Sequence, residues 1–203
     1  MMNTTLRLAL VLLFGLGLWS GCQSDSRVIA DLSDQSYPLV NQDSSTVTFP
    51  DAFKGKLLVV GTIYTHCPDI CSMITANMKR ARQQLGSAED VQFVTITFDP
   101  QRDTPSRLTS YRRSFDVDGT SWAFLTGSPD TVNALMEELG IFHQVVGPDG
   151  SPASPDTLDT YFISHSDRIL FVDTEGQVHP GMNGSRTPPD TLVQAINNLR
   201  SWL

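Results

Sequence analysis

Two cysteines, Cys67 and Cys71, are the side chains of this sequence best suited to metal or redox chemistry. An apolar run over residues 57–64 leads into them and is typical of a strand buried on both faces, and a helical pattern follows. Pro68 fits the first turn of that helix, so Cys67 is predicted to be its N-cap, with Cys71 one turn further on. Four helical steps separate the two Cα atoms by about 6 Å and leave both side chains on one side. The pair is therefore expected to form a disulfide or to bind one metal ion through two thiolates.

The position of the pair favours a reactive role over a structural one. The orphan N–H groups and the dipole of a helix N-terminus favour the thiolate and lower the pKa of a thiol placed there. A static disulfide is the structural alternative, but closing so short a loop constrains the unfolded chain little. Two thiolates are soft ligands that suit Cu(I), and an added imidazole can also serve Cu(II). We therefore interpret Cys67 and Cys71 as a metal-binding or redox pair.

The elements that must position the pair alternate between strands and helices. Thr104 and Ser128 each precede a proline, as helix N-caps often do. The pattern favours an α/β fold with a central mixed β-sheet flanked by helices and a short N-terminal hairpin. A strand that delivers two cysteines to a helix N-terminus is the thioredoxin-like arrangement. The predicted strands cover residues 39–40, 47–49, 57–64, 91–98, 121–125, 141–146, 161–163 and 168–173, and the predicted helices begin near residues 68, 105, 129 and 189.

The N-terminal segment is predicted to be a targeting sequence. Arg7 precedes an apolar run over residues 8–19, shorter than the roughly 20 residues that a membrane-spanning helix needs. The run ends in Leu-Trp-Ser-Gly-Cys22 and resembles the lipobox of bacterial lipoproteins, in which the cysteine is lipidated and becomes the mature N-terminus. Simple cleavage that leaves Cys22 as a free thiol is the alternative.

This interpretation divides the chain into a lipoprotein signal peptide at residues 1–21, a flexible polar tether at residues 22–36 and one domain at residues 37–203. It places the domain in the cell envelope, on the periplasmic side, held on a lipid membrane by lipidated Cys22. Disulfides can persist in that compartment. Gln23 leaves the choice between the inner and the outer membrane open.

The charge of the chain excludes one class of partner. Of the 14 basic residues only Arg7 lies in residues 1–21, so removal of that segment leaves 13 basic and 22 acidic residues and a net charge of −9. An acidic domain of this kind is a poor binder of nucleic acid.

Four segments resemble the Sco (SenC) family of copper proteins in their order and spacing, and the resemblance covers roughly residues 36–203. It implies a thioredoxin-like fold and a copper site formed by Cys67, Cys71 and His165. It also implies a part in assembling the dinuclear copper centre of cytochrome c oxidase, by delivering copper to subunit II or by reducing the cysteines there. Ser164 stands where the family often has aspartate, which bears on how the loop carrying the histidine is held. The segments are Tyr-Thr-His-Cys67-Pro-Asp-Ile-Cys71, Phe-Asp99-Pro-Gln-Arg-Asp103-Thr-Pro, Trp-Ala-Phe-Leu-Thr-Gly127 and Tyr-Phe-Ile-Ser-His165-Ser.

Other polar side chains near these segments are candidates for supporting roles. His66 is expected to point away from the cysteine beside it, and to support the site from outside or lie on the surface. Asp99 and Asp103 either orient the cysteine loop or meet a partner, or they are ordinary turn and helix-start residues. The two remaining histidines, His143 and His179, are expected to be solvated.

A second class of function, thiol–disulfide reductase acting on a partner protein's cysteines, stays open. Cys67 would attack the partner disulfide and Cys71 would resolve the mixed disulfide. Two features argue against this as the main role. Such enzymes have a proline facing the cysteines, where this chain has Ser164-His-Ser-Asp167, and most have two residues between the cysteines instead of three.

Overall fold

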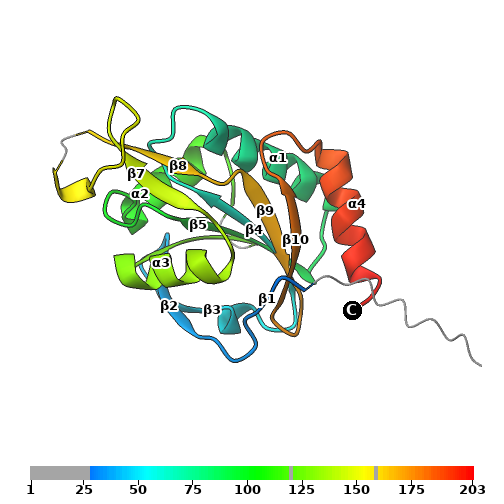
Figure 1. Cartoon of the computed structure of the whole chain (residues 1–203). Helices are drawn as coiled ribbons and strands as arrows, with labels where there is room; N and C mark the ends of the chain where they lie inside the picture. Colours follow the sequence, from blue (N-terminus) through cyan, green and yellow to red (C-terminus); the bar gives the residue numbers. More distant parts are fainter. Residues whose placement is uncertain (1–27, 119–120, 158–159) are drawn as a thin grey trace, which may run out of the picture.

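The computed structural model describes residues 28–118, 121–157 and 160–203 (Figure 1). The predicted signal peptide, residues 1–21, lies outside the described residues, as do Cys22 and the first part of the predicted tether. The rest of that tether belongs to the domain, because β1 (Ala30–Asp31) pairs with β10 (Gln177–Asn183) and Leu32 is completely buried in the core. The domain therefore begins several residues before the predicted boundary.

A mixed sheet of eight strands forms the centre of the domain. Besides β1 and β10 it contains β2 (Tyr37–Asn41), β3 (Thr46–Phe49), β4 (Leu57–Ile63), β5 (Val91–Thr97), β6 (Trp122–Gly127) and β9 (Arg168–Val172). The strand order is β1-β10-β9-β4-β5-β6-β2-β3. The β4–β5 and β5–β6 pairs are parallel and the others antiparallel. This confirms the predicted α/β fold with a central mixed sheet, and the predicted N-terminal hairpin is β2–β3 at one edge.

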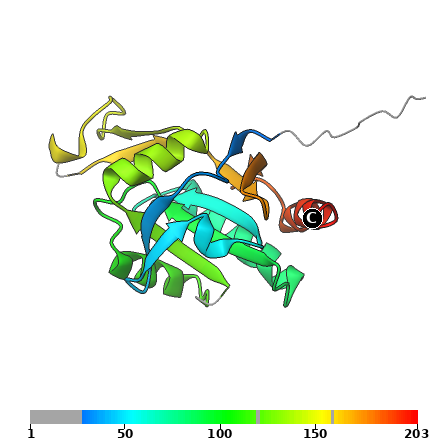
Figure 2. The same cartoon turned by 90° about the horizontal axis from the view of Figure 1, so that it is seen from below.

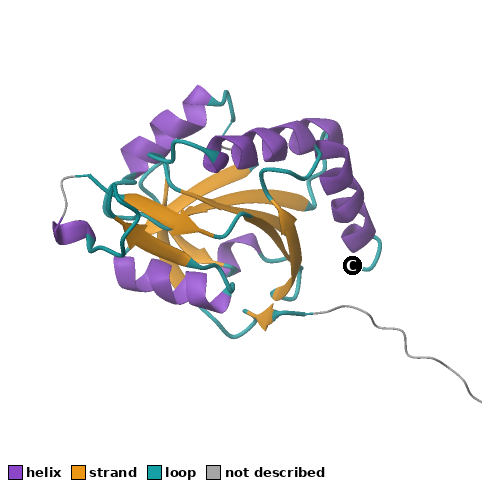
Figure 3. Cartoon of the chain, turned by 45° about the horizontal axis from the view of Figure 1, so that its top comes forward, coloured by secondary structure: helices purple, strands orange, loops and turns teal. Residues whose placement is uncertain are grey.

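Helices cover both faces of the sheet (Figures 2 and 3). Thr104 and Ser128 cap two of them by accepting hydrogen bonds from the N–H groups of Arg107 and Thr131 at 3.4 and 3.1 Å, as predicted. No helix in the described part of the chain is both long and apolar enough to cross a bilayer. The helices are α1 (Ile70–Leu85), α2 (Pro105–Ser114), α3 (Pro129–Glu138) and α4 (Pro189–Arg200), with short 3-10 helices η2 (Asp51–Phe53) and η3 (Pro155–Thr157).

The strand and the helix that flank the cysteines pack closely against each other. Every residue of β4 is buried, as expected of a strand covered on both faces. A Cβ on Gly61 of β4 would lie 2.4 Å from the sulfur of Met78 in α1, so a side chain at position 61 would force the side chain of Met78 to move. This close contact holds the strand before Cys67 against the helix that carries Cys71.

The start of α1 differs from the sequence-based prediction. The helix begins at Ile70 with Asp69 at the N-cap position, and Cys67 lies in the turn before it. The N–H of Cys67 donates to the carbonyl oxygen of Tyr64 at 3.2 Å. The prediction of Cys67 as N-cap is wrong because the chain first makes this turn at Tyr64 to Cys67, and the helix starts only at Ile70.

A separate hairpin carries the candidate histidine. It consists of β7 (His143–Val146) and β8 (Phe162–His165), which form their own antiparallel pair outside the eight-stranded sheet (Figure 1). His165 is therefore the last residue of a strand and not, as predicted, a loop residue. It lies directly opposite His143 in the register of the hairpin.

Candidate metal centre

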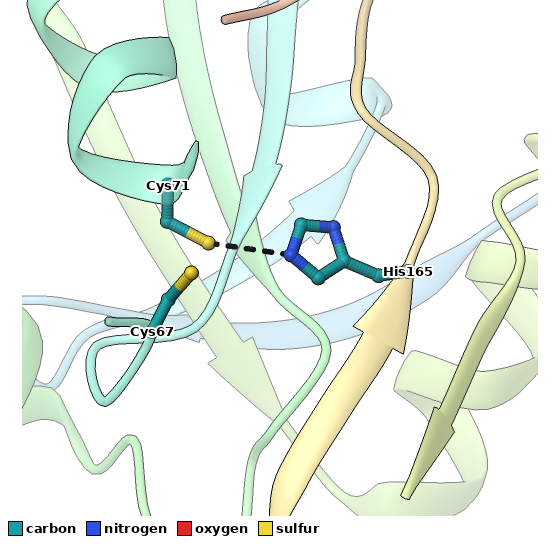
Figure 4. Close-up of side chains that lie close together, drawn as sticks. All are labelled: Cys67, Cys71 and His165. Carbon is teal, nitrogen blue, oxygen red and sulfur yellow. Dashed lines mark hydrogen bonds between the residues drawn. The ribbon is translucent and has the colours of Figure 1, made fainter. Parts of the chain in front are cut away.

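Three side chains that are distant in the sequence meet beyond the end of β4 (Figure 4). Cys67 comes from the turn after that strand, Cys71 from the first turn of α1 and His165 from the end of β8. Both cysteines are free thiols. Their two Sγ atoms and one imidazole nitrogen all lie within 4.8 Å of one another. Within the described ranges no other cluster of histidine, cysteine or acidic side chains is close enough to share a metal ion.

A backbone carbonyl group helps to orient the imidazole of His165. Its Nδ1 lies 2.8 Å from the carbonyl oxygen of Ser166, and a carbonyl oxygen can only accept a hydrogen bond. Nδ1 therefore carries the proton of the neutral ring, and Nε2 keeps a lone pair. That Nε2 lies 3.6 Å from the Sγ of Cys71. A neutral imidazole whose other nitrogen is hydrogen-bonded is the form that binds metal ions.

The two thiols differ strongly in acidity. The side chain of Cys71 is buried, and this burial is the main cause that raises its pKa well above the usual range. Cys67 is only half-buried, and the hydrogen bond from the Cys71 thiol is the main cause that lowers its pKa to about 4. The N–H groups of Asp69 and Cys71 lower it further. At neutral pH the pair is therefore a Cys67 thiolate held by a neutral Cys71 thiol.

Two aromatic rings pack against His165 and shield it. The ring of Tyr64 makes an edge contact at a centroid distance of 5.8 Å, and the ring of Phe98 a tilted contact at 4.6 Å. Both rings are buried. The sequence-based prediction missed their role. Each directly follows a parallel strand, β4 or β5, and because the carboxyl ends of adjacent parallel strands meet at one edge of a sheet, that signal could have placed them together.

Asp103 holds the turn that carries Cys67. The carboxylate is fully buried and accepts hydrogen bonds from the N–H and the hydroxyl of Thr65 at 2.9 and 2.5 Å, and from the hydroxyl of Thr97 at 2.6 Å. Burial raises the pKa of Asp103, and the bonds from Thr65 and Thr97 oppose that shift. These contacts support the loop-orienting role that the sequence left open.

Replacing Asp103 with alanine should lower the free energy of unfolding by about 2–4 kcal/mol, because the N–H of Thr65 and the hydroxyl of Thr97 lose their acceptor. Urea unfolding of the reduced protein measures this loss. Asp34→Ala removes an exposed carboxylate and is the matched control, with an expected change within about 0.5 kcal/mol. Equal unfolding curves for the two variants would contradict an anchoring role.

The other two supporting candidates lie in different surroundings. Asp99 is buried, forms an ion pair with Arg102 and accepts a hydrogen bond from the hydroxyl of Tyr161 at 2.7 Å. The imidazole of His66 is 39% exposed and lies 3.9 Å from the buried carboxylate of Asp103. It does not belong to the cluster of three ligand atoms.

The prediction that the two remaining histidines are solvated is wrong. His143 is half-buried: its ring stacks on Phe98 at 5.9 Å and its Nε2 lies 2.9 Å from the side-chain oxygen of Asn133. His179 is only 7% exposed, and its Nε2 lies 2.7 Å from the carboxylate of Asp173. The Pro/Gly-rich sequence around His179 concealed the strand β10, which places this side chain inward.

The fold and the site together define a class of protein: a thioredoxin-like α/β domain in which two cysteines before and within the first turn of a helix face a histidine from a neighbouring hairpin. Comparison with known families identifies the family within that class. The chain belongs to the SCO1/SenC family, whose family model matches residues 28–201. This agrees with the resemblance found in the sequence.

Curated relatives carry the same family name. A SCO1 protein homolog of Bacillus subtilis is 25% identical over 169 residues, which cover 81% of each chain. SCO1 homolog 2 of Arabidopsis thaliana, a mitochondrial protein, is 30% identical over 145 residues, which cover 70% of this chain and 51% of the relative. The chain thus spans about half of the Arabidopsis protein.

Solved structures share the fold. A SCO1/SenC family lipoprotein of Bacillus anthracis is 25% identical with a TM-score of 0.70, over 87% of this chain and 98% of the other. ScoI of Bradyrhizobium japonicum, solved with copper bound, is 24% identical with a TM-score of 0.68, over 81% and 97% of the two chains. BsSco, described as a Sco family cytochrome c oxidase assembly protein with a disulfide switch, is 21% identical with a TM-score of 0.66, over 88% and 98%.

Proposed function

We propose that this protein binds one copper ion through Cys67, Cys71 and His165 and passes it to a partner. The observation that carries the proposal is the convergence of two sulfur atoms and an unprotonated Nε2 within 4.8 Å. Thiolates select soft ions such as Cu(I), and the imidazole extends the site to Cu(II). A structural zinc site usually has four protein ligands, and the described residues bring only three together here.

The three-ligand arrangement suits a metallochaperone, for which copper is cargo. An acceptor with its own thiolates can add a ligand to the three-coordinate ion before Cys67, Cys71 or His165 leaves. Transfer then proceeds by exchange of one ligand at a time, without release of free copper. Membership of the SCO1/SenC family supports the choice of acceptor, namely the dinuclear copper site of cytochrome c oxidase subunit II.

We place this activity at the periplasmic face of a membrane, with lipidated Cys22 as the anchor after removal of residues 1–21. The sequence before Cys22 supports this placement, and a related Bacillus anthracis protein is a lipoprotein. Mass spectrometry of the protein purified from membranes tests the anchor: a mature N-terminus at Cys22 carrying acyl chains supports it, and an unmodified Cys22 contradicts it.

Copper binding by the soluble domain tests the central proposal. The chain from Gln23 is prepared reduced and oxidised and loaded with copper, and metal content and absorption are recorded. We expect one copper per reduced protein, with thiolate-to-Cu(II) charge-transfer bands, and none in the oxidised protein, because a disulfide offers no thiolate. The loaded protein is then mixed with the soluble copper domain of subunit II in its reduced form. A reduced protein that binds no copper, or copper that stays with the donor, would contradict the proposal.

The asymmetry of the two thiols supports a second candidate, reduction of a partner's disulfide. The Cys67 thiolate attacks one partner sulfur, forms a mixed disulfide and expels the other partner sulfur as a thiolate. Cys71 then loses its proton and attacks the sulfur of Cys67, which forms the Cys67–Cys71 disulfide and releases the second partner thiolate. If the reduced protein opens the oxidised cysteine pair of subunit II but binds no copper, this second function replaces the first.

A further inference from the structure

The hairpin that carries His165 pairs with no strand of the eight-stranded sheet, although the chain continues from β8 into β9 through only two residues. β7 and β8 form a two-stranded sheet of their own. A two-stranded hairpin is marginally stable in water by itself. The imidazole therefore keeps its place beside the cysteines only while other contacts hold the hairpin against the domain.

We propose that Arg102 is a positioning residue that clamps this hairpin and so holds His165 within reach of Cys67 and Cys71. The proposal rests on the copper-binding function proposed above, because its purpose is to keep the imidazole ligand in place. Arg102 lies in the segment between β5 and α2, and its partner Tyr161 directly precedes β8.

The contacts of Arg102 form a closed triangle with Asp99 and Tyr161. Its Nε lies 2.5 Å from a carboxylate oxygen of Asp99, and its Nη1 donates to the carbonyl oxygen of Tyr161 at 3.0 Å. The guanidinium also stacks on the ring of Tyr161, with Cζ 3.5 Å from the centroid. The hydroxyl of Tyr161 closes the triangle by donating to the other oxygen of Asp99 at 2.7 Å.

The triangle is largely shielded from solvent. Asp99 and Tyr161 are 3% and 6% exposed, and the side chain of Arg102 is 22% exposed. Hydrogen bonds between charged groups are shorter and stronger than neutral ones, and low solvent exposure strengthens them further. Lysine cannot replace arginine here, because an ammonium group lacks the planar fork that bonds to two acceptors while stacking on a ring.

The downstream end of the hairpin is held separately. Asp167, two residues after His165, accepts hydrogen bonds from the N–H and the hydroxyl of Ser185 at 2.8 and 2.5 Å. The carbonyl oxygen of Ser185 in turn accepts a bond from Asn77 of α1 at 2.9 Å. Loss of the Arg102 clamp is therefore expected to loosen Tyr161 and the start of β8, while the segment after His165 stays attached to the helix that bears Cys71 and Ile163 keeps its contacts with the core.

Arg112 provides a matched control. Like Arg102 it is partly buried, donates from Nη1 to a backbone carbonyl oxygen, that of Val117 at 2.8 Å, and has another buried guanidinium nitrogen without a partner. Its carbonyl partner follows α2 and has no part in the hairpin. Arg102→Gln, Arg102→Lys and Arg112→Gln thus make similar chemical changes in two different places.

The first experiment is hydrogen–deuterium exchange of the metal-free reduced protein. Amides of Phe162 to His165 should exchange at least tenfold faster in both Arg102 variants than in wild type, and at the wild-type rate in Arg112→Gln. Faster exchange in Arg112→Gln alone, or unchanged exchange in both Arg102 variants, would overturn the clamp. This readout does not depend on copper, so it remains decisive if the proposed function fails.

The second experiment measures copper affinity by competition with a chelator. Arg102→Gln should bind copper about 10–100-fold more weakly than wild type, the usual loss when a group that orients a ligand is removed. Arg102→Lys should show a similar loss and Arg112→Gln none.

A double variant tests whether Arg102 affects copper affinity through His165. In a His165→Ala background the Arg102→Gln change should have no further effect on affinity, because the group it positions is gone. If Arg102→Gln lowered copper affinity equally in the presence and absence of His165, Arg102 would not act by positioning that residue. Wild-type protein that binds no copper would refute the proposed function and leave the exchange result to decide the clamp.

Discussion

His165→Ala should bind copper more than about a hundredfold more weakly than the wild-type protein and remain folded. The loss of a ligand should exceed the roughly 10–100-fold cost of losing a group that merely orients one. Nε2 of His165 is the only imidazole nitrogen within 4.8 Å of both sulfurs among the described residues. The fold should survive because, in the part of the chain that the structure describes, the ring has one hydrogen-bond partner outside the site, the carbonyl oxygen of Ser166 next to it in the chain.

The matched control for this variant is His143→Ala. It removes an imidazole from the position directly opposite His165 in the same hairpin, together with its contacts to Phe98 and Asn133. Its ring nitrogens lie outside the ligand cluster, so wild-type affinity is expected. If both alanine variants lost affinity equally, the effect would belong to the hairpin, and His165 would not be a ligand. A folded His165→Ala protein with wild-type affinity would refute the three-ligand site.

Alkylation of the reduced, metal-free protein should show Cys67 reacting as a thiolate down to unusually low pH. The pKa of Cys67 is lowered from the usual 9.0 to about 4. Its alkylation rate should therefore be nearly constant from neutral pH down to about pH 5 and fall as pH drops through about 4. An ordinary thiol, with a pKa of 9.0, is already mostly protonated below pH 9. Cys71, buried and with a raised pKa, should react only after unfolding.

The expected difference in alkylation rate between Cys67 and an ordinary thiol follows from two opposing effects. At pH 5 a thiol of pKa about 4 has roughly ten-thousandfold more thiolate than one of pKa 9.0. The less basic thiolate is intrinsically slower by roughly two hundredfold, for a Brønsted coefficient of about 0.45. Cys67 should therefore react roughly fiftyfold faster than glutathione at pH 5, as measured by mass spectrometry of iodoacetamide-labelled peptides.

The variant Cys71→Ala tests the cause of this acidity. The hydrogen bond from Cys71 is the largest contribution that lowers the pKa of Cys67, so its removal should move the midpoint of the rate profile to higher pH. Ser72→Ala, which changes an exposed neighbour, should leave the midpoint in place. A wild-type midpoint near 9, or no shift in Cys71→Ala, would show that the two thiols are not coupled as the structure indicates.

Local patterns in the sequence sufficed for most of the fold. Proline after a capping residue marked the starts of α2 and α3, and apolar runs marked β4 and β5, because these signals involve neighbours in the chain. The predicted N-cap of α1 was wrong because a turn, closed by the hydrogen bond from Cys67 to Tyr64, precedes the helix. The amino-acid composition of the segment gives little indication of such a turn.

The candidate site was only partly predictable, for a physical reason. Cys67 and Cys71 are close in the chain, so helical geometry alone brings them together. His165 lies 94 residues from Cys71, and it was the family resemblance that assigned it to the pair as a ligand. The Arg102–Tyr161 contact spans 59 residues and joins two loops, so no local pattern could reveal it.

The pairing of β1 with β10 limits how far the domain can move from a lipid anchor at Cys22, if that residue is lipidated as proposed above. The N–H of Ile29 already bonds to Val178, so only six residues separate the domain from Cys22. Six residues can span at most about 20 Å. The predicted tether would have allowed about 50 Å. With Cys22 lipidated as proposed, the domain stays within a thin layer above the lipid headgroups. It can therefore serve only acceptors whose metal sites project to that height, and it meets them by lateral diffusion in two dimensions.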